Sequence, residues 1–124
     1  MKFTELKTPC YVIDEQKLIK NLEILKSVQD RTGCKILLAQ KAFSAFCVYP
    51  LMSKYLSGTT ASGLYEAKLG HECFGKETHI FAPAFKENDF EKILKICGHI
   101  VFNSFSQLEK YRDNWQNSDV SVGI

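Results

Sequence analysis

The chain has 124 residues, of which 45% are hydrophobic and 24% are charged, which is typical of one folded domain. Its net charge is only +2, and Arg31 and Arg112 are its only arginines, so we expect no nucleic-acid partner. Apolar runs stop well short of the roughly 18 residues of a membrane span, and the first residues lack the apolar core of a signal peptide. We therefore expect a cytoplasmic protein with no membrane partner. Because its five cysteines form no C-x-x-C pair, we also expect no zinc site.

The first predicted elements are a short strand over residues 8–13 and a helix that follows it. Asp14 is a suitable N-cap, and Gly33 is a suitable residue to end the helix. Between them apolar side chains recur at helical spacing, at Leu18, Leu22, Leu25 and Val28. We assign residues 1–33 to a strand and helix that lead into the main fold.

Residues 35–43 form an apolar run that contains Lys41 near its end, which is typical of a buried parallel strand. In α/β folds the chemistry collects at the carboxyl ends of such strands. Strand alternation places Lys41 on the same face as Leu37 and Ala39, and Gln40 on the opposite face, where its amide needs a partner. Position alone leaves two interpretations open: a solvated lysine, or a reactive amine at the mouth of a pocket.

Strands and helices then alternate about every 20 residues, which is close to the spacing of a (β/α)₈ barrel. We predict helices over residues 48–56 and 90–97, a helix capped by Ser62 whose pattern is broken by Gly70 and Gly75, and a helix opened by Ser104 and Gln107. We predict strands over residues 59–61, 78–82 and 100–102, and a last strand that begins at 120. A complete barrel needs about 250 residues. Residues 34–124 are therefore expected to form about five parallel units of a partial barrel, truncated in a strand; the alternative is a doubly wound sheet.

Two further motifs carry little functional signal. Gly70 to Lys76 matches G-x-x-x-x-G-K, but Glu77 replaces the hydroxyl residue, and the match follows a helix where a phosphate loop follows a strand. His79 and His99 begin separate predicted strands, far from His71 in the sequence. We interpret the histidines as core or surface residues, and we expect no metal site.

Three blocks of the sequence carry a family resemblance: LLAQKAFS around Lys41, SGTTASGLYEAKLG, and HIVFNS. Together they resemble the pyridoxal-phosphate decarboxylases of the alanine-racemase fold, fold type III. Within that group the chain is similar to the carboxynorspermidine/carboxyspermidine decarboxylases of bacterial polyamine and spermidine synthesis, over its whole length and as their N-terminal portion. Thr59 stands where related ornithine and arginine decarboxylases have an aspartate, and Gln40 replaces an apolar residue beside the lysine.

The resemblance implies the N-terminal part of a cofactor-binding (β/α)₈ barrel of the TIM type, in which Lys41 is the catalytic residue. Lys41 would hold pyridoxal 5′-phosphate as a Schiff base, with Ala39, Thr60 and Ser62 in the pocket wall. Asn103 and Ser104 follow a later strand and occupy an equivalent place; the alternative role of Ser104 is that of a helix cap only.

The implied reaction is decarboxylation of carboxynorspermidine or carboxyspermidine to norspermidine or spermidine. In such enzymes later strands, a C-terminal β-domain and the partner subunit of a homodimer complete the site, so this chain alone is expected to be inactive. Three alternatives remain: a non-catalytic barrel that binds the same cofactor, a decarboxylase of diaminopimelate, ornithine or arginine, and a plain α/β interaction domain.

Overall fold

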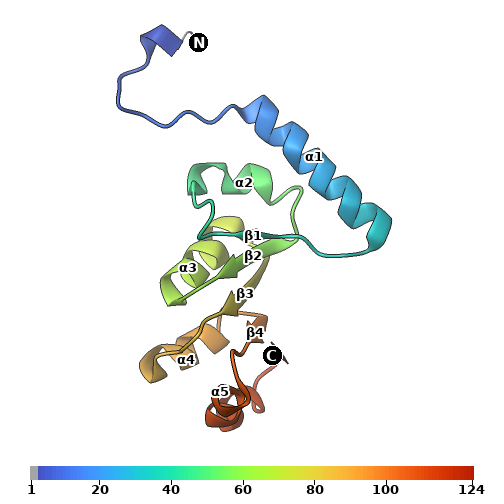
Figure 1. Cartoon of the computed structure of the whole chain (residues 1–124), viewed down its shortest axis with the longest axis vertical. Helices are drawn as coiled ribbons and strands as arrows, with labels where there is room; N and C mark the ends of the chain where they lie inside the picture. Colours follow the sequence, from blue (N-terminus) through green and yellow to red (C-terminus); the bar gives the residue numbers. More distant parts are fainter. Residues whose placement is uncertain (1–2) are drawn as a thin grey trace.

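The computed structural model describes residues 3–124 and contains one five-stranded sheet, with α3 and α4 on the same side of the strands (Figure 1). Short 3₁₀ helices form at Phe3–Glu5 and Phe46–Val48, and a π-helical turn forms at Gly70–Phe74. Within residues 3–124, no helix is both long enough and apolar enough to cross a membrane. The other elements are α1 (Glu15–Thr32), β1 (Leu37–Ala39), α2 (Tyr49–Met52), β2 (Gly58–Ala61), α3 (Leu64–Leu69), β3 (Glu77–Phe81), α4 (Glu87–Leu94), β4 (His99–Val101), α5 (Phe105–Lys110), α6 (Arg112–Trp115) and β5 (Ser121–Gly123).

The five strands are all parallel and lie in the order β1-β2-β3-β4-β5. A doubly wound sheet reverses its strand order at a switch point, so its first strand lies inside the sheet. Here each strand pairs with its successor, which is the arrangement of a (β/α)₈ barrel. The predicted partial barrel is therefore confirmed, and the doubly wound alternative is wrong.

One face of the sheet packs against the helices, and the other is the face that would line a barrel. Ile80, Ile100 and Phe102 are at most 1% exposed and belong to the larger core cluster, with Phe90 and Ile93 of α4. A second cluster joins Leu22 of α1 to α2 and the π-helical turn through Tyr49, Met52, Leu56 and Phe74. Burial alternates along β3 and β4, so the residues between these apolar positions lie on the inner face.

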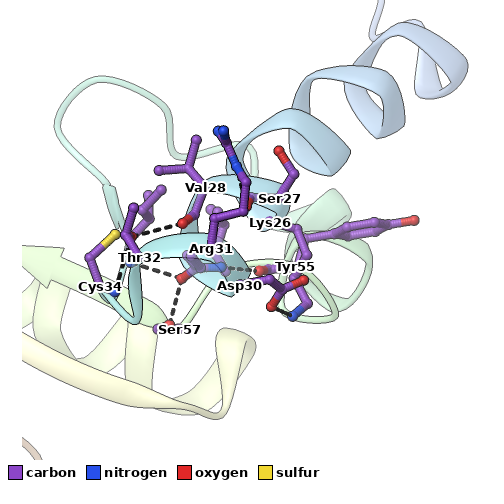
Figure 2. A network of polar contacts seen from close by, with 12 residues as sticks. Lys26, Ser27, Val28, Asp30, Arg31, Thr32, Cys34, Tyr55 and Ser57 are labelled. Atoms are coloured by element: carbon purple, nitrogen blue, oxygen red, sulfur yellow. Dashed lines mark hydrogen bonds and ion pairs between the residues drawn. The ribbon is translucent and has the colours of Figure 1, made fainter.

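Helix α1 forms where its caps predict, and a glutamine attaches it to the sheet. The Asp14 side chain accepts a hydrogen bond from the Lys17 N–H, and Gly33 ends the helix in the left-handed conformation. The Gln29 amide donates to the Tyr55 carbonyl (2.7 Å), and its oxygen accepts from the Ile36 N–H (2.8 Å) and the Ser57 hydroxyl (2.6 Å). Figure 2 shows Tyr55 and Ser57 beside the last turns of α1.

The structure differs from the sequence prediction at the first strand. Residues 6–14 form no strand, and Tyr11 is fully exposed, because no neighbouring strand within residues 3–124 pairs with this segment. Figure 1 shows the segment running away from the sheet toward the N-terminus. The assignment of residues 1–33 to a separate leading unit stays a prediction, but its strand is wrong.

The middle helices also differ from the prediction. Helix α2 is shorter than expected, and the N-cap of α3 is Gly63 instead of Ser62. Gly70 does not break the chain of helical turns, because α3 continues into the π-helical turn and ends only at Gly75. A Cβ atom on Gly70 would lie 2.2 Å from Thr59 Oγ1, so a residue without a side chain is required for this close approach to β2.

The inner face carries a polar row that the sequence did not predict: Lys35, Glu77, His79 and His99. Glu77 forms an ion pair with Lys35 and accepts from His79 Nε2 at 3.0 Å, and the rings of His79 and His99 lie 5.0 Å apart. The hydrogen bonds from Lys35 and His79 lower the pKa of Glu77. Burial, and then the neighbouring His79, lower the pKa of His99, while Glu77 acts in the opposite direction.

This row predicts that acidification destabilises the fold. The pKa of His99 is lowered on folding, so the unfolded chain takes up the proton first, and stability falls as the pH drops through 6.5. The lowered pKa of Glu77 adds a second loss, below about pH 4.5. We expect His99→Gln to flatten the first decline and leave the second. Urea unfolding at several pH values measures both; a His99→Gln profile identical to that of the exposed-site control His71→Gln would contradict the assignment.

The contact between Gly70 and Thr59 predicts a second stability effect. Ala is normally favoured over Gly in a helix by about 1 kcal/mol, but the clash at Gly70 reverses the sign. We expect Gly70→Ala to lower the free energy of unfolding by about 1–3 kcal/mol, as overpacking does. Gly98→Ala is the control for an added methyl group that meets no clash, since Gly98 lies in the bend before β4 and a Cβ there meets no atom within 4 Å. Equal urea midpoints for the two variants would show that β2 can move away without cost.

Candidate functional site

A small cavity lies at the carboxyl ends of the first three strands, on the inner face of the sheet. It is lined by Ala39, Lys41, Thr60, Ala61, Ser62 and Phe81. Its volume is about 70 Å³, well below the roughly 300–1,000 Å³ of a pocket that encloses a ligand. The cavity is therefore one wall of a larger site, at the edge where the chemistry of parallel α/β folds collects.

Lys41 lies at this edge because β1 ends just before it. Register pairs Ala39 with Thr60, and the Gln40 N–H extends the ladder to the Thr60 carbonyl at 3.3 Å. The chain then turns sharply, since the N–H groups of Ala42 and Phe43 both donate to the Ala39 carbonyl. Lys41 is exposed at this turn, and no hydrogen bond or ion pair joins its amine to another residue within 3–124. Its amine is thus accessible at the cavity.

The structure brings the predicted wall residues together with Lys41. Ala39 and Thr60 are neighbours across β1 and β2, and Ser62 lies two residues beyond Thr60, at the level of Lys41. Their side chains are small, which leaves space beside the amine. The Ser62 N–H donates to a Glu66 carboxylate oxygen at 2.5 Å, which fixes the loop after β2 against the first turns of α3.

Gln40 points into the helix layer, as strand alternation predicted, and finds two partners there. Its side chain is 1% exposed. The amide nitrogen donates to the Glu66 carbonyl at 2.8 Å, and the amide oxygen accepts from the Tyr49 hydroxyl at 3.2 Å. Tyr49 is itself fully buried, and this burial raises the pKa of its hydroxyl. The residue that precedes Lys41 is therefore fastened to α2 and α3.

Thr59 lies on the face opposite the cavity. Its side chain is fully buried against Gly70, and its hydroxyl oxygen has no hydrogen-bond partner among the described residues. Thr59, where the resemblance implied an aspartate in related enzymes, therefore faces the helix layer and lies outside the lining of the cavity. Phe81, by contrast, lines the cavity and was missed. It lies two residues beyond His79 on β3, but only the register across β2 shows that it reaches the site.

Asn103 and Ser104 do not line the cavity that holds Lys41. The Ser104 hydroxyl accepts from the Gln107 N–H at 3.2 Å, and the Gln107 side chain accepts from the Asn103 N–H at 2.7 Å. The Ser104 hydroxyl therefore caps α5 as predicted, while the Gln107 side chain binds the N–H one residue before the N-cap. The structure therefore supports the structural interpretation of Ser104.

The glycine-lysine motif forms no phosphate loop. Gly70 to Phe74 is the π-helical turn, and the Lys76 amine donates to the Leu56 carbonyl at 3.0 Å. Within the described part of the chain, no three histidine, cysteine or acidic side chains lie close enough to hold a metal ion. The cavity beside Lys41 is consequently the candidate with both an accessible nucleophile and the expected place in the fold.

The lining of the cavity fits one end of pyridoxal 5′-phosphate. Lys41 would supply the amine that the aldehyde group requires, and Ala39 and Thr60 have small side chains that leave room beside it. Among the six lining residues only Lys41 is ionisable, so this wall contains no acid for the pyridine nitrogen and no cation other than Lys41 for the phosphate.

Comparisons with known proteins agree with the resemblance read from the sequence. No family model matches the chain. Curated relatives include carboxynorspermidine/carboxyspermidine decarboxylases of Herminiimonas arsenicoxydans, 42% identical over 112 residues, and Campylobacter jejuni, 40% identical over 122 residues. A carboxyaminopropylagmatine decarboxylase of Synechocystis is 37% identical over 123 residues. These matches cover 90%, 98% and 99% of this chain but only 31%, 32% and 32% of the relatives.

A solved structure shows the same likeness in three dimensions. The crystal structure of carboxynorspermidine decarboxylase complexed with norspermidine, from Campylobacter jejuni, superimposes with a TM-score of 0.92 at 42% identity. The match covers 96% of this chain and 32% of that chain. The chain thus spans about a third of the length of the proteins it matches. The predicted resemblance is confirmed. Nearly the whole of this chain is similar to a segment of the carboxynorspermidine/carboxyspermidine decarboxylases that makes up about one third of their length.

Proposed function

We propose that this chain supplies the cofactor lysine of a pyridoxal-phosphate-dependent decarboxylase that converts carboxynorspermidine or carboxyspermidine to norspermidine or spermidine. One observation supports this most directly: Lys41 has an accessible amine at the carboxyl end of β1, in a fold that matches carboxynorspermidine decarboxylase at 42% identity. The substrate class follows the names of the relatives and the norspermidine bound in that neighbour. A carboxy-lyase reaction in polyamine synthesis is the function that these observations favour.

Lys41 would bind the cofactor covalently through its amine, with Ala39, Thr60 and Ser62 beside it. When bound, pyridoxal phosphate supplies an electron sink for the electron pair that remains when carbon dioxide leaves. The contribution of the chain itself is to position the lysine, since β1 and the turn after Ala39 hold the Lys41 amine at the cavity. Because Lys41 is the only ionisable residue in the lining, it is also the group in this wall that can accept or release a proton near the reacting atoms.

The proposed site is incomplete within this chain. The phosphate and the pyridine nitrogen lack partners in the lining, and the cavity is too small to enclose a substrate. We therefore infer that the chain binds the cofactor without releasing carbon dioxide. The homodimer and the cytoplasmic location stay predictions of the family resemblance.

Covalent trapping tests the role of Lys41. We expect the 124-residue chain, mixed with pyridoxal phosphate and reduced with borohydride, to carry a pyridoxyl group on Lys41 in preference to other lysines. The reason is that Lys41 is accessible and unpaired at a cavity on the predicted cofactor face. Peptide mass spectrometry locates the adduct. Lys41→Ala should reduce the total pyridoxyl label on the chain by at least about nine tenths, which is a tenfold loss.

Lys68→Ala is the matched control, because Lys68 is an exposed lysine on α3 that lies outside the cavity lining. It should leave the labelling unchanged. Equal labelling of Lys41 and Lys68 in the unaltered chain would contradict the assignment of Lys41 as the cofactor lysine.

A chimera tests the reaction. We expect no carbon dioxide from carboxynorspermidine with the 124-residue chain, but release when this chain replaces the matching third of the Campylobacter jejuni enzyme. Lys41→Ala within the chimera should abolish that release, with Lys68→Ala as the active control. Diaminopimelate, ornithine and arginine are the competing substrates to measure. A folded chimera that binds the cofactor but releases no carbon dioxide would favour the non-catalytic alternative.

A further inference from the structure

We propose that Gln40 is a positioning residue for Lys41, acting through a hydrogen-bonded clamp that joins Gln40, Tyr49, Glu66 and Ser62. This inference rests on the proposed role of Lys41 as the cofactor lysine. It concerns the residue that directly precedes Lys41 in the sequence.

The first argument is the place of Gln40 in the backbone. Its N–H makes the last ladder bond from β1 to β2, to the Thr60 carbonyl at 3.3 Å. The following residue, Lys41, already lies in the turn, where no hydrogen bond joins its side chain to the described residues. The direction of Lys41 therefore depends on how firmly its predecessor is held.

The second argument is that both ends of the Gln40 amide are engaged in a dry environment. The nitrogen donates to the Glu66 carbonyl of α3, and the oxygen accepts from the Tyr49 hydroxyl of α2. Gln40 is 1% exposed and Tyr49 is fully buried, so neither group can exchange its partner for water. An apolar side chain here would leave the Tyr49 hydroxyl buried without an acceptor.

The third argument is that the clamp reaches the other side of the cavity. Glu66, whose carbonyl accepts from Gln40, accepts the Ser62 N–H with its carboxylate at 2.5 Å. Ser62 and Lys41 both line the cavity but follow different strands, β2 and β1. The same four residues thus set the position of the lysine turn relative to the loop after β2.

A purely structural role and a positioning role make different predictions. Gln40→Met keeps the approximate length of the side chain and removes both of its hydrogen bonds. It leaves the buried Tyr49 hydroxyl without an acceptor. Gln40→Met/Tyr49→Phe removes the polar groups on both sides and should recover much of the stability. If Gln40 positions Lys41, the double variant regains stability without regaining a correctly oriented amine. Tyr49→Phe alone keeps the bond to Glu66 and is the matched control.

The experiment measures the rate at which pyridoxal phosphate and cyanoborohydride label Lys41 in the 124-residue chain, with Lys68 as the internal reference. We expect the double variant to label Lys41 about tenfold more slowly than the unaltered chain, since small misplacements have effects of this size. Tyr49→Phe should stay within about twofold, and Lys68 should not change. The circular dichroism of the bound cofactor should weaken in the double variant, as its orientation becomes less fixed.

The outcomes separate this inference from the proposed function. Selective labelling of Lys41 in the unaltered chain, with an equal rate in the folded double variant, overturns the role of Gln40 and leaves the cofactor lysine standing. No selective labelling in the unaltered chain overturns both. If the Met variants do not fold, Gln40→Asn retains an amide that is too short to reach both partners, and the same comparison of rates decides.

Discussion

The pairing of five parallel strands in sequence order is the constraint on which the rest of the structure depends. Parallel neighbours need crossover connections of one hand, so the helices collect on one face and the other face is left for the barrel interior. The same constraint brings the carboxyl ends of β1 and β2 to one edge. Lys41 and Ser62, which lie far apart in the sequence, become neighbours at the cavity for this reason.

Strand β1 is only three residues long, so its position depends on side chains at both ends. At its start, Gln29 of α1 binds the Ile36 N–H together with the loop before β2. At its end, Gln40 binds α2 and α3. The amide side chains of Gln29 and Gln40, one half-buried and one buried, therefore help to hold this edge strand in place. Strands β2, β3 and β4 are held by a second neighbouring strand instead.

Much of this arrangement follows from local signals in the sequence. The caps Asp14 and Ser104, the alternation that sends Gln40 into the helix layer, and the place of Lys41 at a strand end all depend on neighbours within a few residues. The misses depend on distant partners. Residues 8–13 have strand composition but no described strand to pair with, and Gly70 is a glycine within helical turns because a Cβ there would clash with Thr59. The polar row on the inner face required the register of β3 and β4.

The π-helical turn after α3 has a consequence for the spacing of the chain. The Gly75 N–H at the end of this turn donates to the carbonyl of Gly70, five residues earlier. The turn therefore holds one more residue than an α-turn. Phe74 consequently meets the ring of Tyr49 edge-on at 5.5 Å, and Tyr49 in turn binds Gln40. If the same sequence formed an α-turn here, Phe74 would lie at a different angle about the helix axis, because an α-turn holds fewer residues than a π-turn. The residue count of this turn is therefore part of the geometry of the lysine site.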